Sequence, residues 1–224
     1  MNVLANGPDS FIWWEWIGDH TDEIWTQTKQ HVWLTVVSVF LGLLIAGVLS
    51  ALALRVRWTY SPITWVTGIL YTIPSLALFV FLVPYVGLGT KPAVIGLVSY
   101  TLLILVRNIV AGVDGVSPAI REAADGMGYT RWRRFFSVEL RLATPAIIAG
   151  IRIAAVTVVG LVTVTALVGE GGYGKFINDG LSRDFSTPIV LGLVLSVALA
   201  VVIDVALLLL ERWVTPWTRR GVRA

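Results

Sequence analysis

Five long runs of apolar residues, separated by short polar segments, dominate the sequence. Each run has roughly the 20 residues that an α-helix needs to cross the hydrocarbon core of a bilayer. The runs are continuous rather than alternating, and only helices or closed barrels satisfy every backbone polar group in lipid, so helices are expected. The runs cover residues 32–54, 63–84, 92–113, 144–168 and 188–211. The pattern therefore predicts an all-α, polytopic membrane protein with about five transmembrane helices.

The composition agrees with this fold class and excludes several kinds of function. Of the 224 residues, 56% are hydrophobic and only 14% are charged, whereas soluble domains carry about 25% charged residues. The net charge of +3 does not indicate nucleic-acid binding, because basic residues in a membrane protein mainly set its orientation. The absence of cysteine excludes disulfides, zinc–thiolate sites and thiol catalysis.

The basic residues divide unevenly between the polar segments. Segments 55–62, 107–142 and 212–224 hold twelve of the 17 lysines and arginines, whereas segments 1–31, 85–91 and 169–187 hold four. Cytoplasmic loops carry an excess of Lys and Arg, so the first set is expected in the cytoplasm. The amino terminus then lies outside, and residues 213–224 form a cytoplasmic tail. Met1–Ser10 has no basic stretch before an apolar core, so we expect no cleavable signal peptide.

Tryptophan and acidic residues are concentrated between Phe11 and Trp25. Tryptophan favours the headgroup region of a membrane, and the apolar residues here recur at near-helical spacing. We therefore expect an interfacial helix at the outer surface. It belongs to an extracytoplasmic segment of residues 1–30 that precedes a transmembrane domain of residues 31–212.

The second apolar run is interrupted by Pro74, which lies between Tyr71 and Ser75. Proline removes a backbone hydrogen bond and bends a helix. Interrupted helices also line the pathways of many transporters. Two interpretations stay open, a plain bend and a lining of a translocation path. Pro84 and the glycines after it are expected to end the run.

The polar segment 114–143 has the pattern of a helical hairpin. Ser117 can cap a helix, and Pro118 suits the first helical position. Gly126 and Gly128 permit a sharp reversal of the chain. Thr130 can then cap a second helix that carries apolar residues on one face, with arginines beside them. These residues are Trp132, Phe135, Phe136, Val138 and Leu140, with Arg131, Arg133, Arg134 and Arg141.

The two halves of this hairpin are expected to lie differently. An amphipathic, arginine-rich second helix should lie along the inner membrane surface with its arginines near lipid phosphates. The first helix is then pushed out into the cytoplasm. A short protruding helix predicts a docking element for another protein.

At this hairpin the chain resembles the permeases of binding-protein-dependent ABC importers. Their signature loop reads Glu-Ala-Ala, three residues, Gly, nine residues, an aliphatic residue, and then a Leu-Pro step. The matching residues are Glu122, Ala123, Ala124, Gly128, Val138 and Leu140. Arg141 stands where the family usually has proline, and Pro145 is a candidate to supply part of that bend. The resemblance extends over about residues 30–210.

Within that family the chain is similar to the subgroup for osmoprotectants such as glycine betaine, choline and carnitine. Residues 71–78, the turn at 87–92, and Ile151 with Arg152 carry this likeness. If the cargo is a quaternary ammonium, aromatic faces are its natural contacts, although aromatic residues in spans more often serve packing. The candidates for the translocation path are Tyr71, Pro74, Ser75, Phe79, Phe81 and Tyr100.

The resemblance implies a type I importer fold in a bacterial inner membrane. It also implies a second permease subunit, identical or similar, two ATPase subunits that bind ATP and Mg²⁺, and an external binding protein. Each permease presses its loop into a cleft on an ATPase; the small Ala123 and Ala124 would enter that cleft, and Glu122 would pair with basic groups. We expect no cofactor or metal on this chain, no nucleic-acid partner and no enzymatic activity.

Arg152 and Asp204 are charges within predicted spans, each about 10 Å from the cytoplasmic side. Lone charges in lipid are costly, so we expect them to form an ion pair that braces the fourth and fifth spans. A gate or substrate role is the alternative.

Residues 169–176 contain glycine patterns like those of phosphate-binding loops. Phe176 stands where such a loop needs Ser or Thr, and the segment follows a membrane span rather than a strand. We expect an outer loop with a short helix near Phe176–Leu181, which either contacts a binding protein or caps the spans. His20 and His31 are expected to be surface residues rather than metal ligands.

Two alternatives to an osmoprotectant importer stay open. The same architecture could carry another small solute, such as an amino acid, methionine or a sulfonate. A secondary transporter, driven by an ion gradient, would need no ATPase.

Overall fold

The computed structural model describes residues 11–219, which form helices and turns without a β-strand among them. The expectations for Met1–Ser10, and for the last five residues of the carboxyl-terminal tail, lie outside these described residues. The tail expected from residue 213 begins as the end of α10, followed by the short turn η4 (Pro216–Arg219).

Among the described residues, four helices are long and apolar enough to cross a membrane, and a sharply bent pair is the candidate for a fifth crossing. They are α2 (Thr21–Arg55), α5 (Thr90–Asp114), α8 (Leu140–Thr165) and α10 (Ser186–Val214), with the bent pair α3 (Tyr60–Thr72) and α4 (Ser75–Val86). The all-α class with about five spans is confirmed.

The first span is longer than expected. With 35 residues, α2 is about 50 Å long, and it begins at Thr21 instead of residue 32. The single interfacial helix expected between Phe11 and Trp25 is therefore two pieces. The short α1 spans Trp14–Asp19. His20 follows it with a non-helical backbone, and α2 starts at the next residue.

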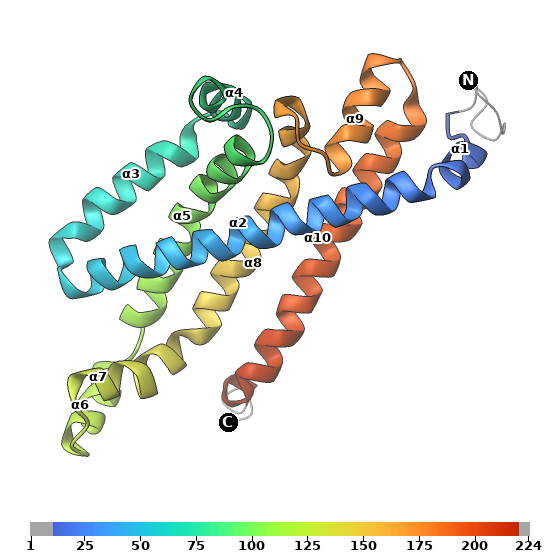
Figure 1. Ribbon diagram of the computed structural model, residues 1–224. Coiled ribbons are helices and arrows are strands. Elements are labelled where there is room, and N and C mark those ends of the chain that lie inside the picture. The colour runs from blue at the N-terminus through green and yellow to red at the C-terminus, as the bar shows by residue number, and fades with distance from the viewer. Residues whose placement is uncertain (1–10, 220–224) are drawn as a thin grey trace.

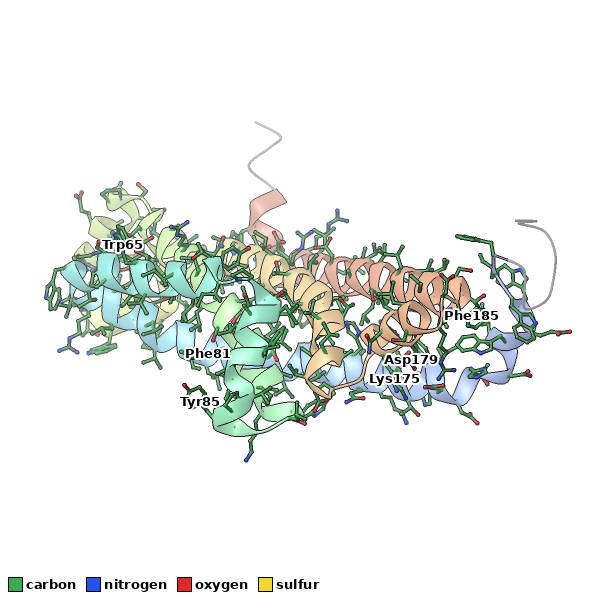
Figure 2. The ribbon with its side chains drawn as sticks, turned by 90° about the horizontal axis from the view of Figure 1, so that it is seen from above. Trp65, Phe81, Tyr85, Lys175, Asp179 and Phe185 are labelled. Atoms are coloured by element: carbon green, nitrogen blue, oxygen red, sulfur yellow. The ribbon has the colours of Figure 1, made fainter. Side chains whose placement is uncertain are left out.

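The short α1 packs against α9 and the start of α10. The Trp16 ring lies edge-on to Phe176 and Phe185, with centroids 6.4 and 5.6 Å apart. The Trp13 amide donates a hydrogen bond of 2.9 Å to the Thr187 hydroxyl. Figure 2 shows Phe185 beside this amino-terminal segment. These contacts join the first helix to the start of α10.

The interruption at Pro74 is a break rather than a bend. The axes of α3 and α4 differ by 97°. Ile73 has an extended backbone (φ −64°, ψ 130°), which is the conformation that a following proline imposes. Pro84 lies inside α4 and does not end it; Gly87, with φ at 81°, does.

α5 lies at the centre of the bundle, packed between α2 and α8 (Figure 1). One apolar cluster joins Leu34 of α2, Leu97 of α5 and Val158 of α8. Close approach depends on small residues: a Cβ on Gly150 would lie only 2.5 Å from Asn108 of α5. Small residues at such contacts let membrane helices pack closely in the absence of a hydrophobic driving force.

The polar connections gather at opposite ends of this bundle (Figure 1). α6 (Pro118–Gly126) and α7 (Arg131–Arg134) form a hairpin at one end, near the short turn η1 (Arg57–Thr59). α9 (Tyr173–Ser182) lies at the other end, after the turn η3 (Ala166–Val168).

Candidate functional site

The α6–α7 hairpin forms through the local signals expected of it. Pro118 occupies the first turn of α6, although the Ser117 side chain makes no capping hydrogen bond. Gly128 has a φ of 80°, a left-handed conformation that favours glycine. The Thr130 hydroxyl then accepts a hydrogen bond of 3.4 Å from the Arg133 amide, which caps α7.

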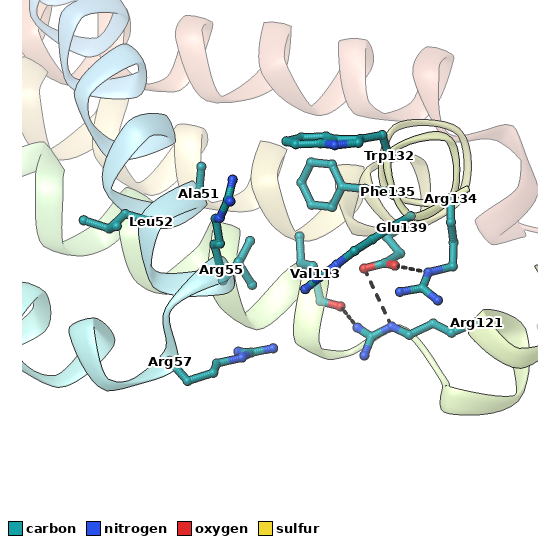
Figure 3. Close-up of a pocket in the computed structure, with 12 residues that line it drawn as sticks. Ala51, Leu52, Arg55, Arg57, Val113, Arg121, Trp132, Arg134, Phe135 and Glu139 are labelled. Carbon is teal, nitrogen blue, oxygen red and sulfur yellow. Dashed lines mark hydrogen bonds and ion pairs between the residues drawn. The ribbon is translucent and has the colours of Figure 1, made fainter. Parts of the chain in front are cut away.

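A charged network holds the hairpin in place (Figure 3). The buried Glu139 carboxylate accepts a 2.8 Å hydrogen bond from Arg134 Nε and lies 3.7 Å from Arg121 Nε. Arg134 also pairs with Asp125, and Arg121 donates to the carbonyl of Val113 at 2.7 Å. α6 is therefore tied both to the end of α5 and to the second half of the hairpin. Sequence reasoning missed Glu139, although an acid among apolar positions was a signal.

The signature residues of α6 do not share one environment. Glu122 and Ala123 are exposed, and Glu122 makes no ion pair with another described residue. Ala124 is only 1% exposed, so its side chain is covered by this chain itself. Its role in contact with an ATPase stays a prediction.

The second half of the hairpin is not the separate surface helix that was expected. α7 has only four residues and continues through the π-helical turn η2 (Phe135–Glu139) into α8. Trp132 and Phe136 are nevertheless 66% and 59% exposed, with their rings stacked 6.1 Å apart.

Arg141, at the position of the family proline, lies in regular helix near the start of α8. Its guanidinium lies 5.1 Å from the centroid of the Trp217 ring, a cation–π distance. Pro145 is inside α8 as well. The irregular winding lies before both residues, in the π-helical turn η2. Neither Arg141 nor Pro145 is therefore at the irregular turn, and Arg141 contacts Trp217 of the carboxyl-terminal turn η4.

The aromatic path candidates separate into buried and exposed residues. Phe79 is fully buried in the core cluster with Leu34 and Leu97, so it is a packing residue and not an accessible contact. Tyr100 is also buried; its hydroxyl donates a hydrogen bond to the carbonyl of Ile73, at the break between α3 and α4. Tyr100 therefore satisfies a backbone group that the break leaves without a helical partner.

The exposed path candidates lie around that break. Tyr71 is 38% exposed and meets Tyr100 edge-on, with ring centroids 5.9 Å apart. Pro74 is exposed and Ser75 is partly so. On α4, Phe81 and Tyr85 form a pair 5.4 Å apart that faces outward (Figure 2). Tyr85 was missed, although its spacing of four from Phe81 places both on one helical face.

Arg152 and Asp204 lie in contact, joining α8 to α10. Arg152 Nε and Nη2 donate to the two Asp204 oxygens at 2.9 and 3.0 Å. Glu211, about two helical turns further along α10, lies 3.4 Å from Arg152 Nη1 and was not expected. The cluster therefore has two carboxylates and one guanidinium. A further charge within a predicted span, Arg107 of α5, was also missed. It is exposed and pairs with no described side chain.

The glycine-rich segment at the opposite end is fastened to α2. The amides of Gly172 and Tyr173 donate to Gln27 Oε1 (2.8 Å) and His31 Nδ1 (3.2 Å). His31 Nε2 lies 3.0 Å from the carbonyl oxygen of Val159. His31 is thus fully buried, contrary to the surface position expected, because both ring nitrogens have backbone partners.

Glu170 extends this contact to α5. Its carboxylate accepts hydrogen bonds of 2.6 Å from Gln30 of α2 and from Thr90 of α5. α9 begins at Tyr173, three residues before the helix expected here, and presents Lys175 and Asp179 at its surface (Figure 2). Close packing on this chain, rather than a ligand, accounts for the glycines of the segment.

Residues 38–216 match the family described as binding-protein-dependent transport system inner membrane component. The osmoprotectant import permease protein OsmW of Salmonella typhimurium is 35% identical over 92% of this chain and 96% of its own length. The glycine betaine/carnitine/choline transport system permease protein OpuCB of Bacillus subtilis is 33% identical over 90% and 93%. The choline permease OpuBB of Bacillus subtilis is 35% identical over 87% and 89%.

Solved structures show the same fold. The MetNI methionine ABC transporter, in an inward-facing conformation, contains a chain that superposes with a TM-score of 0.73 at 23% identity, over 86% of this chain and 96% of that one. An amino acid ABC transporter with histidines gives a TM-score of 0.74 at 15% identity, over 88% and 96%. The type I importer permease fold is confirmed. The chain therefore belongs to the family of binding-protein-dependent transport system inner membrane components, which are multi-pass membrane permeases rather than catalytic subunits.

Proposed function

We propose that this chain is the permease subunit of an ATP-driven importer that carries a compatible solute, such as glycine betaine, choline or carnitine, by alternating access. Relatives named for these cargos match most of the chain at 33–35% identity. The transporters of methionine and amino acids resemble it at 23% and 15% identity. This likeness supports a common fold and gives no information about the cargo.

The assembly that follows from this proposal contains more than one permease. A second copy, or a similar permease, completes the path, and two ATPase subunits bind ATP and Mg²⁺. An external binding protein delivers the solute to the end that carries α9. The end with the α6–α7 hairpin faces the cytoplasm of a bacterial cell, since its arginines satisfy the positive-inside rule, and the amino terminus lies outside.

One observation carries the coupling role: the α6–α7 hairpin protrudes from the bundle (Figure 1) and is braced internally by Glu139. A lever must be rigid and must offer a contact to what moves it. The brace provides the rigidity, and the exposed carboxylate of Glu122 provides a charged contact for basic groups on the ATPase.

The coupling role is tested by comparing two glycines of the hairpin in the reconstituted transporter. Gly128→Pro cannot adopt the native φ of 80°, since proline holds φ near −65°. We expect uptake to fall at least about tenfold while ATP hydrolysis continues. Gly126→Ala is the matched control, because a Cβ there meets no atom within 4 Å and its backbone is helical.

Uptake assays in the same vesicles also test the cargo. We expect labelled choline, carnitine or glycine betaine to accumulate only with ATP, the binding protein and the ATPase present. Accumulation of methionine alone would assign another cargo to the same architecture. Uptake driven by an ion gradient without the ATPase, or full uptake by Gly128→Pro, would contradict the proposal.

A further inference from the structure

A cavity of about 690 Å³ lies between the end of α2 and the α6–α7 hairpin (Figure 3). Its lining comes from segments far apart in the sequence: the last turn of α2, the end of α5, α6, and the α7–η2 segment. The lining residues are Ala51, Leu52, Leu54, Arg55, Arg57, Val113, Arg121, Arg131, Trp132, Arg134, Phe135 and Glu139. We refer to it as the arginine cavity. The coupling role assigned above does not use it.

The charges of the arginine cavity are unbalanced. Five arginines face one carboxylate, Glu139. Arg57 is neutralised by Asp114 through two hydrogen bonds of 2.7 Å. Arg121 and Arg134 share Glu139, and Arg134 also pairs with Asp125 outside the cavity lining. The remaining two, Arg55 and Arg131, form no ion pair with any residue between 11 and 219. An excess of guanidinium around a cavity attracts an anion.

Arg121 adds a guanidinium whose charge is incompletely balanced. Its Nε lies 3.7 Å from the nearest Glu139 oxygen and makes no hydrogen bond to a described residue. A phosphate group suits several guanidinium groups at once, because a pair of its oxygens can accept two parallel N–H bonds from one guanidinium.

Part of the cavity wall is apolar, with arginines beside it. Ala51, Leu52 and Leu54 of α2 line the cavity together with Trp132 and Phe135 of the hairpin. A free inorganic anion has no use for such a wall. A ligand with a charged head and an apolar body would contact both parts of the wall.

A lane for that apolar body leads into the cavity along α2. Five large apolar side chains at helical spacing are exposed on this helix and form one stripe. They are Leu41, Leu44, Ile45, Val48 and Leu52. The stripe ends at Leu52, which is itself part of the cavity wall, so an acyl chain lying along it would place its headgroup among the arginines.

We propose that the arginine cavity binds the phosphate headgroup of an anionic phospholipid, in the leaflet at the hairpin end of the molecule. Arg55 and Arg131 contact the phosphate, and one acyl chain lies on the α2 stripe. Basic pockets between membrane helices on the cytoplasmic side favour such headgroups. The bound lipid bridges α2 and the hairpin. This site does not depend on the identity of the transported solute.

The test is a lipid titration of the full-length protein, purified in detergent with the subunits that accompany it, and followed by native mass spectrometry. Phosphatidylglycerol and phosphatidylcholine are titrated in turn against the unaltered protein and the variants Arg55→Gln and Arg131→Gln. Each basic residue near an anionic headgroup is expected to contribute about fivefold in affinity. Each variant should therefore bind phosphatidylglycerol about fivefold more weakly, with phosphatidylcholine binding unchanged.

Arg183→Gln is the matched control, because Arg183 is an exposed arginine beside α9, at the opposite end of the molecule; it should bind phosphatidylglycerol like the unaltered protein. Equal binding by all three variants would overturn the proposal. A third arm adds inorganic phosphate alone: displacement of the lipid by millimolar phosphate, with no preference between the two lipids, would assign the cavity to a free anion instead. Loss of phosphatidylglycerol binding in Arg183→Gln would show a general charge effect and would equally overturn the site.

Discussion

Single residues in this protein are selected mainly by what lies against them. Gly174 is an example: a Cβ at this position would lie 1.9 Å from the carbonyl oxygen of Thr163 in α8. The glycine therefore permits α9 to pack directly on the backbone of α8. The same glycines imitate a phosphate-binding loop in the sequence, and their packing in the structure explains why no phosphate chemistry is needed to account for them.

We expect Gly174→Ala to destabilise the protein by about 1–3 kcal/mol, because the added methyl group forces two backbones apart. Thermal unfolding in detergent measures the effect. Gly160→Ala is the control, since it lies within α8 where a Cβ meets no atom within 4 Å, and alanine is the better helix former. Equal midpoints for Gly174→Ala and the unaltered protein would contradict this packing.

At the scale of elements, charged side chains decide how helices at the arginine-rich end are held together. Arg152 joins α8 to α10 through Asp204 and Glu211, and Arg134 joins the second half of the hairpin to α6 through Asp125. In each case an opposite charge lies on a neighbouring segment. Such pairing is what membrane helices need before they can carry charges in or near lipid.

The α8–α10 cluster predicts an order among its variants. Arg152→Gln leaves the carboxylates of Asp204 and Glu211 both without a cation, whereas Asp204→Asn leaves Arg152 paired with Glu211. We therefore expect Arg152→Gln to lower the unfolding temperature more than Asp204→Asn, because an uncompensated charge costs more than a lost pair.

Unfolding in lipid nanodiscs measures this order, and the double variant Arg152→Gln with Asp204→Asn should be milder than Arg152→Gln alone. If Asp204→Asn proves the more damaging single change, the cluster does not act as a brace centred on Arg152.

The whole molecule has two functionally different ends. The hairpin end carries the signature helix α6 and the arginine cavity, and the other end carries α9 and the segment fastened by His31. α5 and α8 connect them through a closely packed core. This packed core connects α6 with the opposite surface, as the proposed coupling role requires.

The proposed orientation can be measured directly because the chain contains no cysteine. Met127 in the hairpin and Leu181 in α9 are 69% and 67% exposed, so single cysteines at these positions are accessible to reagents. In intact cells we expect a membrane-impermeant maleimide to label Leu181→Cys at once and Met127→Cys only after permeabilisation. The reverse pattern would place the hairpin outside and contradict the coupling role.

The sequence by itself determined the features that depend on neighbours along the chain. Runs of about 20 apolar residues are sufficient to define a membrane-spanning helix, so the five crossings could be predicted. Pro118, Gly128 and Thr130 act within one or two turns, so the hairpin could be predicted as well. The signature residues Glu122 and Gly128 lie close together along the chain, so they could be recognised from the sequence too.

Only the tertiary structure decided which side chains are buried and which charges meet. The burial of His31 and Phe79, and the pairing of Glu211 with Arg152, depend on helices that lie far apart in the sequence. In lipid, a continuous apolar run does not distinguish the face that meets protein from the face that meets acyl chains, because both are apolar. For the same reason the angle at Pro74 and the arginine cavity, which depend on how the helices pack, could not be read from the sequence.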